Sequence, residues 1–120
     1  MYTPYPFRIK IHVDIMAPSM SRNLYKEIHA VTLWGKSKHF KDALQTRELP
    51  IADNQVHNII QESNLIEFHT NEGSRRVLIR HLATGLCMTL NLDSHDILTG
   101  WQNDVTDNHY NLNTNKYFLL

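Results

Sequence analysis

Histidine, arginine, threonine and tryptophan recur at alternate positions in the second half of the chain. Side chains of these types, gathered on one surface, could bind an anion and catalyse a reaction on it. When residues 65–103 are read as strands, every second side chain falls on the same face of a sheet. We expect Arg80 on one face to bind an anion, His69 to move a proton and Trp101 to stack on a planar ligand. Arginine pairs with phosphate through two hydrogen bonds, and aromatic rings hold unstacked bases, so this combination suits RNA. The residues predicted to share this face are Glu67, His69, Arg76, Arg80, Cys87, Thr89, Asn91, Thr99, Trp101 and Asn103.

The same alternation has simpler interpretations. An open sheet face is often only solvated, and Trp101 could then lie over the aliphatic stems of neighbouring side chains. Thr99 could be present only because threonine favours strands. A face that exposes Trp101, Tyr110 and Tyr117 could also bind another protein.

Four short runs after Asn64 supply the strands on which these side chains would stand. The runs are separated by turn residues such as Gly73 and Gly85, which predicts an antiparallel meander. The apolar residues 117–120 could add a last strand. The face opposite to the polar one would form the core, from Ile66, Phe68, Val77, Ile79, Leu86, Met88, Leu90 and Leu98.

The first half of the chain predicts one strand followed by two or three helices. Apolar residues at every second position from 7 to 15 indicate a strand with one buried face, closed by Pro18. Its polar side includes His12, which could reach the predicted site or face water. Helical spacing of apolar residues follows in three stretches. The expected caps and breakers are Ser19 or Ser21 and Gly35 for the first helix, Ser37 and Pro50 for the second, and Asp53 for the third.

These elements predict an α+β fold in which an N-terminal strand and two to three helices pack on a four- to five-stranded antiparallel sheet. The 120 residues fit a single domain, 1–120. No stretch approaches the roughly 20 apolar residues of a membrane-spanning helix.

The chain has a formal net charge of zero, with a net of +4 in residues 1–50 and −4 in residues 51–120. Neutrality argues mildly against nucleic-acid binding.

The sequence predicts neither a metal site nor a cofactor site. Its eight histidines form no HExxH motif, and none of the expected helices carries two histidines at positions i and i+4. The single cysteine, Cys87, excludes an internal disulfide and lies among apolar residues, as a buried structural thiol would.

The stretch from Asp96 to Tyr110, DILTGWQNDVTDNHY, resembles the end of the barnase–EndoU–colicin–RelE ribonuclease superfamily. In its toxin members a late strand carries a threonine and then an aromatic residue two positions on, followed by a polar loop. Thr99 and Trp101 match these positions here. Asn103 and His109 follow, and the Lys-His pair that several members carry ahead of the sheet has a counterpart in GKSKHF, at Lys38 and His39.

This resemblance implies a metal-independent endoribonuclease toxin. In such enzymes the ribose 2′-OH attacks the adjacent phosphate and leaves a 2′,3′-cyclic phosphate, which requires a base, an acid and cations. For this mechanism we expect His39 or His69 to act as base or acid, with His109 as its counterpart. The other implied roles are phosphate binding for Arg80 and Thr99, and substrate binding for Lys38, Arg76, Trp101 and Asn103.

The resemblance also implies a biological setting. Such domains form the C-termini of contact-dependent growth-inhibition effectors, and they act in the cytoplasm of target bacteria. The expected substrate is tRNA, and the expected partner is a cognate immunity protein whose acidic groups would cover the cleft. The alternative is a non-enzymatic binding module, such as an immunity protein or a small adaptor. An enzyme would bring His39, His69, Arg80, Thr99 and His109 into one cleft, whereas a binding module has no such requirement.

Overall fold

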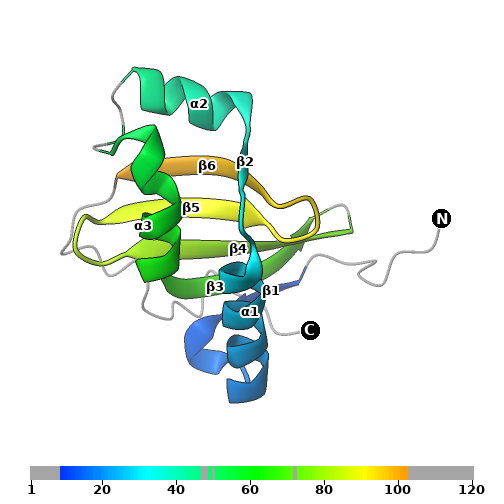
Figure 1. Cartoon of the computed structure of the whole chain (residues 1–120). Coiled ribbons are helices and arrows are strands. Elements are labelled where there is room, and N and C mark those ends of the chain that lie inside the picture. Colours follow the sequence, from blue (N-terminus) through cyan, green and yellow to red (C-terminus); the bar gives the residue numbers. More distant parts are fainter. Residues whose placement is uncertain (1–8, 47–48, 50, 72, 103–120) are drawn as a thin grey trace.

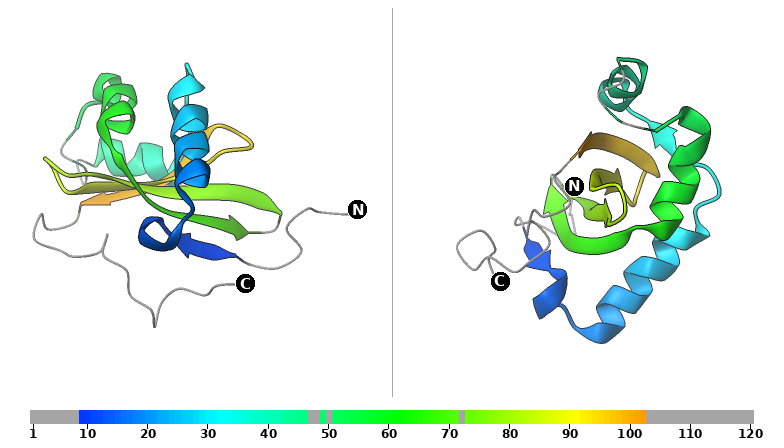
Figure 2. Two further views of the ribbon diagram at one scale, coloured as in Figure 1. Left: turned by 90° about the horizontal axis from the view of Figure 1, so that it is seen from below. Right: turned by 90° about the vertical axis from the view of Figure 1, so that its left-hand side faces the viewer.

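Three helices lie on one face of a six-stranded sheet in the computed structural model of the chain (Figures 1 and 2). The structure describes residues 9–46, 49, 51–71 and 73–102. The strands are β1 (Lys10–His12), β2 (Gly35–Lys36), β3 (Asn64–Asn71), β4 (Ser74–His81), β5 (Leu86–Asn91) and β6 (Asp96–Gln102). The helices are α1 (Pro18–Ala30), α2 (Lys38–Gln45) and α3 (Val56–Glu62), with short 3-10 turns η1 (Val13–Ile15) and η2 (Asp53–Gln55). This arrangement confirms the predicted α+β class.

The sheet is larger than predicted, and it is mixed. Its strands lie in the order β1-β3-β4-β5-β6-β2, and only the β2–β6 pair is parallel. β2 was not expected because it holds just two residues, Gly35 and Lys36. A side chain at position 35 would meet the carboxylate of Asp96 on β6, so glycine permits this close approach. Gly35 therefore belongs to a strand instead of ending the first helix, which ends at Ala30.

The N-terminal strand is shorter than the predicted range 7–15. Within the described residues it covers Lys10–His12, and the chain then turns into η1. His12 causes this change locally, because its Nδ1 accepts a hydrogen bond from the backbone N–H of Asp14 at 3.1 Å. A side chain that bonds the backbone two residues on favours a turn over continued strand.

Helix starts agree with the sequence only in part. Ser37 caps α2 as predicted, since its Oγ accepts from the N–H of Phe40 at 3.1 Å. α1 begins earlier than expected, with Ala17 as the N-cap and Pro18 in its first turn, a position that suits the fixed φ of proline. Asp53 is not the cap of α3, because it lies inside η2, which precedes that helix.

The core lies between the helices and the sheet, and two strand irregularities change its predicted membership. The β3–β4 register shifts between Leu65 and Glu67, which turns Ile66 to the other face of the sheet. The register between β5 and β6 also shifts, and this shift pairs Leu90 with Ile97. Ile97 therefore enters the core, and the half-buried Leu98 does not. Alternation alone cannot anticipate such bulges, because each inserts one extra residue. Among the described residues, none of the helices combines the length and the apolar run that a membrane crossing needs.

Candidate functional site

The strand register gathers the predicted polar residues on the face of the sheet that the helices do not cover. His69 lies opposite Arg76, and Thr99 lies opposite Thr89. The prediction of which residues share this face is thus confirmed for its described members. We call the polar sheet face the surface formed by Lys10, His12, Asn64, Ile66, Glu67, His69, Arg76, Leu78, Arg80, Cys87, Thr89, Asn91, Thr99 and Trp101.

The polar sheet face consists of three rows that cross the strands. Residues directly opposite in neighbouring strands are about 5 Å apart, and successive rows are about 7 Å apart along a strand. The first row is Lys10, His69, Arg76 and Asn91; the second is His12, Glu67, Leu78, Thr89 and Thr99; the third is Asn64, Arg80, Cys87 and Trp101.

The face is not open throughout, as it would be if it were only a solvated surface. Ile66, Leu78 and Cys87 form a buried apolar cluster there, with Trp101 packed against it. Cys87 is buried as predicted. Arg80 is 0% exposed, so its guanidinium is not placed to meet a phosphate that binds at the surface.

The predicted catalytic residues do not converge in one cleft. Along β4, Arg80 lies four residues from the position opposite His69, a separation of about 13 Å. Thr99 is on β6, three strands away from His69 on β3, a separation of about 14 Å. His109 and Asn103 lie outside the described residues.

Lys38 and His39 lie on the other side of the sheet. They are exposed in the first turn of α2, where Lys38 Nζ is 3.6 Å from a carboxylate oxygen of Asp42. α2 packs on the helix-covered face of β6, because a Cβ at Gly100 would meet the ring of Phe40. The neighbours of Gly100 on β6, Thr99 and Trp101, point to the opposite face. The Lys-His pair is therefore separated from the other predicted residues by the sheet.

A cluster that the sequence did not assign forms where β1 meets β3. Antiparallel pairing sets Lys10 opposite His69 and His12 opposite Glu67, and Arg76 follows on β4. We call Lys10, His12, Glu67, His69 and Arg76 the acid–base cluster. The alternation of β1 already placed Lys10 and His12 on one face, but only its pairing with β3 shows which residues they join.

The acid–base cluster has a buried part and a surface part. His12 is 0% exposed and Glu67 is 4% exposed, whereas His69 and Arg76 are half-buried. Lys10 Nζ lies 3.6 Å from Glu67 Oε2, which balances the buried carboxylate. Arg76 Nε donates to Ser74 Oγ at 3.2 Å, and among the described residues no carboxylate pairs with its terminal nitrogens. The terminal N–H donors of the Arg76 guanidinium group therefore belong to a residue that lies directly opposite His69, at the surface.

This arrangement can transfer protons next to an anion. Histidine and carboxylate side chains are the usual groups for general acid–base work, and lysine and arginine stabilise the charge that develops on a phosphate. Among the described residues, no group of three or more histidine, cysteine, aspartate or glutamate side chains is arranged to hold a metal ion.

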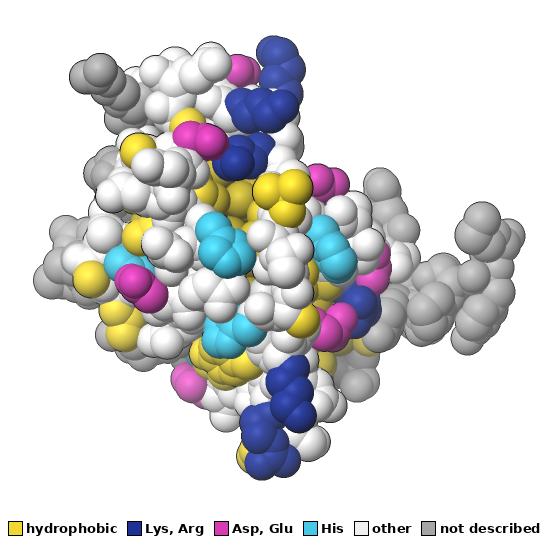
Figure 3. Space-filling view, viewed as in Figure 1, with side chains coloured by type: hydrophobic (Ala, Val, Ile, Leu, Met, Phe, Trp, Pro, Cys, Tyr) yellow, Lys and Arg dark blue, Asp and Glu magenta, His cyan; other side chains and the backbone are white. Residues whose placement is uncertain are grey.

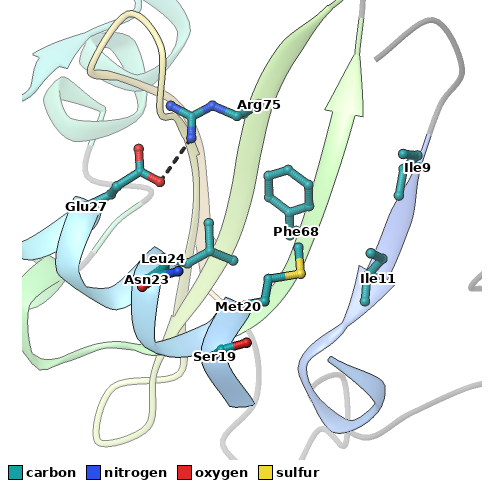
Figure 4. Close-up of a pocket in the computed structure, with 9 residues that line it drawn as sticks. All are labelled: Ile9, Ile11, Ser19, Met20, Asn23, Leu24, Glu27, Phe68 and Arg75. Atoms are coloured by element: carbon teal, nitrogen blue, oxygen red, sulfur yellow. Dashed lines mark hydrogen bonds and ion pairs between the residues drawn. The ribbon is translucent and has the colours of Figure 1, made fainter. Parts of the chain in front are cut away.

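A cavity of about 430 Å³ lies on the other side of β1, between that strand and α1 (Figure 4). Its walls are mainly apolar, with Met20 and Phe68 toward the centre and the Glu27–Arg75 ion pair at one end. Ile11 lines this cavity, so the side chains of Lys10 and His12 point the opposite way, to the polar sheet face.

Comparisons of the chain with protein-family models, with curated proteins and with solved structures give no match.

Proposed function

We propose that this chain is an endoribonuclease that cleaves RNA without a metal ion, with its active site at the acid–base cluster. The observation that carries the proposal is the cross-strand meeting of His69 with Lys10 on one side and Arg76 on the other. Residues opposite one another in neighbouring strands have Cα atoms about 5 Å apart, so the side chains of Lys10 and Arg76 can hold a phosphate while His69 exchanges a proton with a ribose oxygen beside it. The resemblance to the barnase–EndoU–colicin–RelE superfamily supports the same chemistry.

The reaction needs two proton transfers. A base removes the proton of the ribose 2′-OH, the 2′-oxygen forms a bond to phosphorus, and the bond from phosphorus to the 5′-oxygen breaks. An acid then protonates that 5′-oxygen, leaving a 2′,3′-cyclic phosphate and a 5′-OH. His69 and Glu67 are the two groups, since they share one strand and one face. Lys10 and Arg76 stabilise the charge on the phosphate.

Thr99 and Trp101 extend the surface along which RNA would lie. Both are half-buried on β6, on the same face as the acid–base cluster. Trp101 would stack on a base beyond the cleaved bond, and Thr99 would donate a hydrogen bond to a neighbouring phosphate.

The test is cleavage of total bacterial RNA by the purified chain with EDTA present. We expect discrete tRNA fragments with cyclic-phosphate ends, and a rate lower by about a hundred- to ten-thousand-fold in His69→Gln and Glu67→Gln. The matched control is His29→Gln, an exposed histidine on α1. Intact RNA with a folded chain, or wild-type cleavage by His69→Gln, would overturn the proposal.

The proposal includes the setting that the resemblance implies: a toxin domain of a larger effector, active in the cytoplasm of target bacteria and neutralised by an acidic immunity protein. Production of the chain inside bacteria should then arrest growth, and His69→Gln should relieve the arrest. Arrest that persists in that variant would point to a different site.

A protein-binding role for the polar sheet face is the second candidate. The apolar cluster of Ile66, Leu78 and Cys87, with Trp101 at its margin, favours it. Such a face would bind a partner through Trp101, and Trp101→Ala would abolish that binding while the chain stays folded. An inactive, folded chain in the RNA assay would leave this candidate in place.

A further inference from the structure

The cavity between α1 and β1 has the size and the lining of a small-molecule site. Its volume of about 430 Å³ lies within the range of known ligand pockets, which hold their ligands with apolar side chains and a few polar groups. Leu24 and Phe68 are the buried part of its wall, and Ile9, Ile11 and Met20 are half-buried around them. Figure 4 shows these apolar side chains on both sides of the space between the helix and the strand.

One face of α1 supplies polar side chains to the same cavity. Ser19, Asn23 and Glu27 follow one another at intervals of four residues, so they lie along one side of the helix. Ser19 and Glu27 are therefore about 12 Å apart along the helix axis. Of the residues that line the cavity, Glu27 and Arg75 alone carry a formal charge, and both are at one end of it (Figure 4). An elongated ligand would thus lie along α1 with its polar group at this charged end.

The charged end has a net negative charge, because Arg75 is shared by two carboxylates. Its Nη1 donates to Glu27 Oε2 at 3.0 Å, whereas its Nε and its backbone N–H donate to the two oxygens of Asp93, each at 2.8 Å. Among the described residues, no donor bonds the second oxygen of Glu27, Oε1. One guanidinium against two carboxylates favours a cation over an anion at this end.

A ligand can reach the Glu27 carboxylate, because the side chain is 43% exposed. Figure 3 views the side of the molecule on which α1 lies, and to the right of that helix it shows acidic side chains beside a basic one at the surface. The cavity therefore combines an apolar wall with an accessible acceptor in a negative environment.

We propose that this cavity binds a small organic amine, with its ammonium group at Glu27 Oε1 and its apolar body over Leu24 and Phe68. A hydrogen bond between two charged groups is stronger than one with a neutral donor, so the amine is preferred to an alcohol of the same length. The corresponding carboxylate is disfavoured, because it would approach Glu27 and Asp93. The proposal does not depend on the ribonuclease activity, since the cavity and the acid–base cluster lie on opposite sides of β1.

The test compares hexylamine, 1-hexanol and hexanoate, which share an apolar chain and differ in the polar group. Binding to the full chain is followed by NMR of methionine methyl groups labelled with ¹³C. The sequence holds four methionines, and Met20→Leu assigns the signal of Met20. We expect this signal to shift saturably with hexylamine, to report binding weaker by about tenfold or more with 1-hexanol, and to stay unmoved by hexanoate.

Two variants test the role of the charge. Glu27→Gln should lower the affinity for hexylamine to that for 1-hexanol and leave the binding of 1-hexanol unchanged. Asp42→Asn is the matched control, at an exposed carboxylate that pairs with Lys38 on α2, and it should bind like the wild type.

Three results would overturn the proposal. The first is the absence of a saturable shift with hexylamine, and the second is equal affinity of the wild type for hexylamine and 1-hexanol. The third is a preference for the amine that survives in Glu27→Gln. Loss of 1-hexanol binding in that variant would also count against the proposal, because Glu27 would then shape the cavity instead of selecting the charge of the ligand.

Discussion

Arg75 shows how one charged side chain can join three elements of this fold. Its Nη1 donates to Glu27 on α1 at 3.0 Å, and its Nε donates to Asp93 in the β5–β6 turn at 2.8 Å. The hydrogen bond to Glu27 is the main cause that raises the pKa of Arg75. Burial acts to raise the pKa of Asp93, but the hydrogen bonds from Arg75 outweigh it and lower that pKa below its ordinary value of 3.8.

Asp93 should therefore stabilise the fold in a pH-dependent way. A pKa lowered by folding adds stability that is fully present above the unfolded value and is lost as pH falls through the folded value. We expect Asp93→Asn to lower the free energy of unfolding at pH 7 by no more than about 1 kcal/mol, because solvent screens this half-exposed group. Urea unfolding at pH 7 and near pH 3 measures the effect. A difference between variant and wild type that does not shrink in acid would contradict this account.

The contact between α2 and β6 depends on a missing side chain. A Cβ at Gly100 would lie 2.7 Å from one ring carbon of Phe40, which is fully buried. Ser37 joins the same two elements, since its Oγ donates to the carbonyl of Leu98 at 2.6 Å and its N–H donates to that of Ile97 at 2.9 Å. The start of α2 is thus held tightly to the strand.

Gly100→Ala should destabilise the fold by about 1–3 kcal/mol, although alanine is normally the better residue in a strand. The cause is overpacking against the Phe40 ring. Thermal unfolding of Gly100→Ala, Phe40→Leu and the double variant forms a cycle that measures the coupling. We expect the smaller leucine to relieve part of the cost of alanine. Strictly additive effects would show that the two positions do not compete for space.

At the scale of the whole molecule, we expect the middle of the sheet to be the most stable part of the fold. β4 and β5 each have a long antiparallel neighbour on both sides, whereas the outermost strands are the three-residue β1 and the two-residue β2. The acid–base cluster spans β1, β3 and β4, so it reaches from the edge toward the stable centre.

Amide hydrogen exchange should follow this order. We expect the slowest amides in β4 and β5 and faster exchange in β1 and β2, because short edge strands open without global unfolding. Exchange followed by NMR at neutral pH measures it residue by residue. Protection of the β1 amides as strong as that of the β4 amides would contradict this prediction. It would mean that β1, which carries Lys10 and His12, opens only when the whole fold unfolds.

The sequence by itself determined the α+β class and the face on which Glu67, His69, Arg76, Thr99 and Trp101 stand. Those inferences rest on period-two alternation, a local property that survives in any sheet that these strands form. Even so, Ile66 and Leu98 were wrongly predicted to lie in the main core, because each lies at a β-bulge. The one residue that a bulge inserts changes which of the following side chains face the core.

Only the tertiary structure decided which of these residues are neighbours. It paired Lys10 and His12 of β1 with His69 and Glu67 of β3, more than fifty positions later in the chain, and it left Lys38 and His39 on the far side of the sheet. It also buried Arg80 and enclosed Trp34. The physical reason is that strand order and helix placement minimise the apolar area exposed over the whole chain. No local sequence pattern determines this total area.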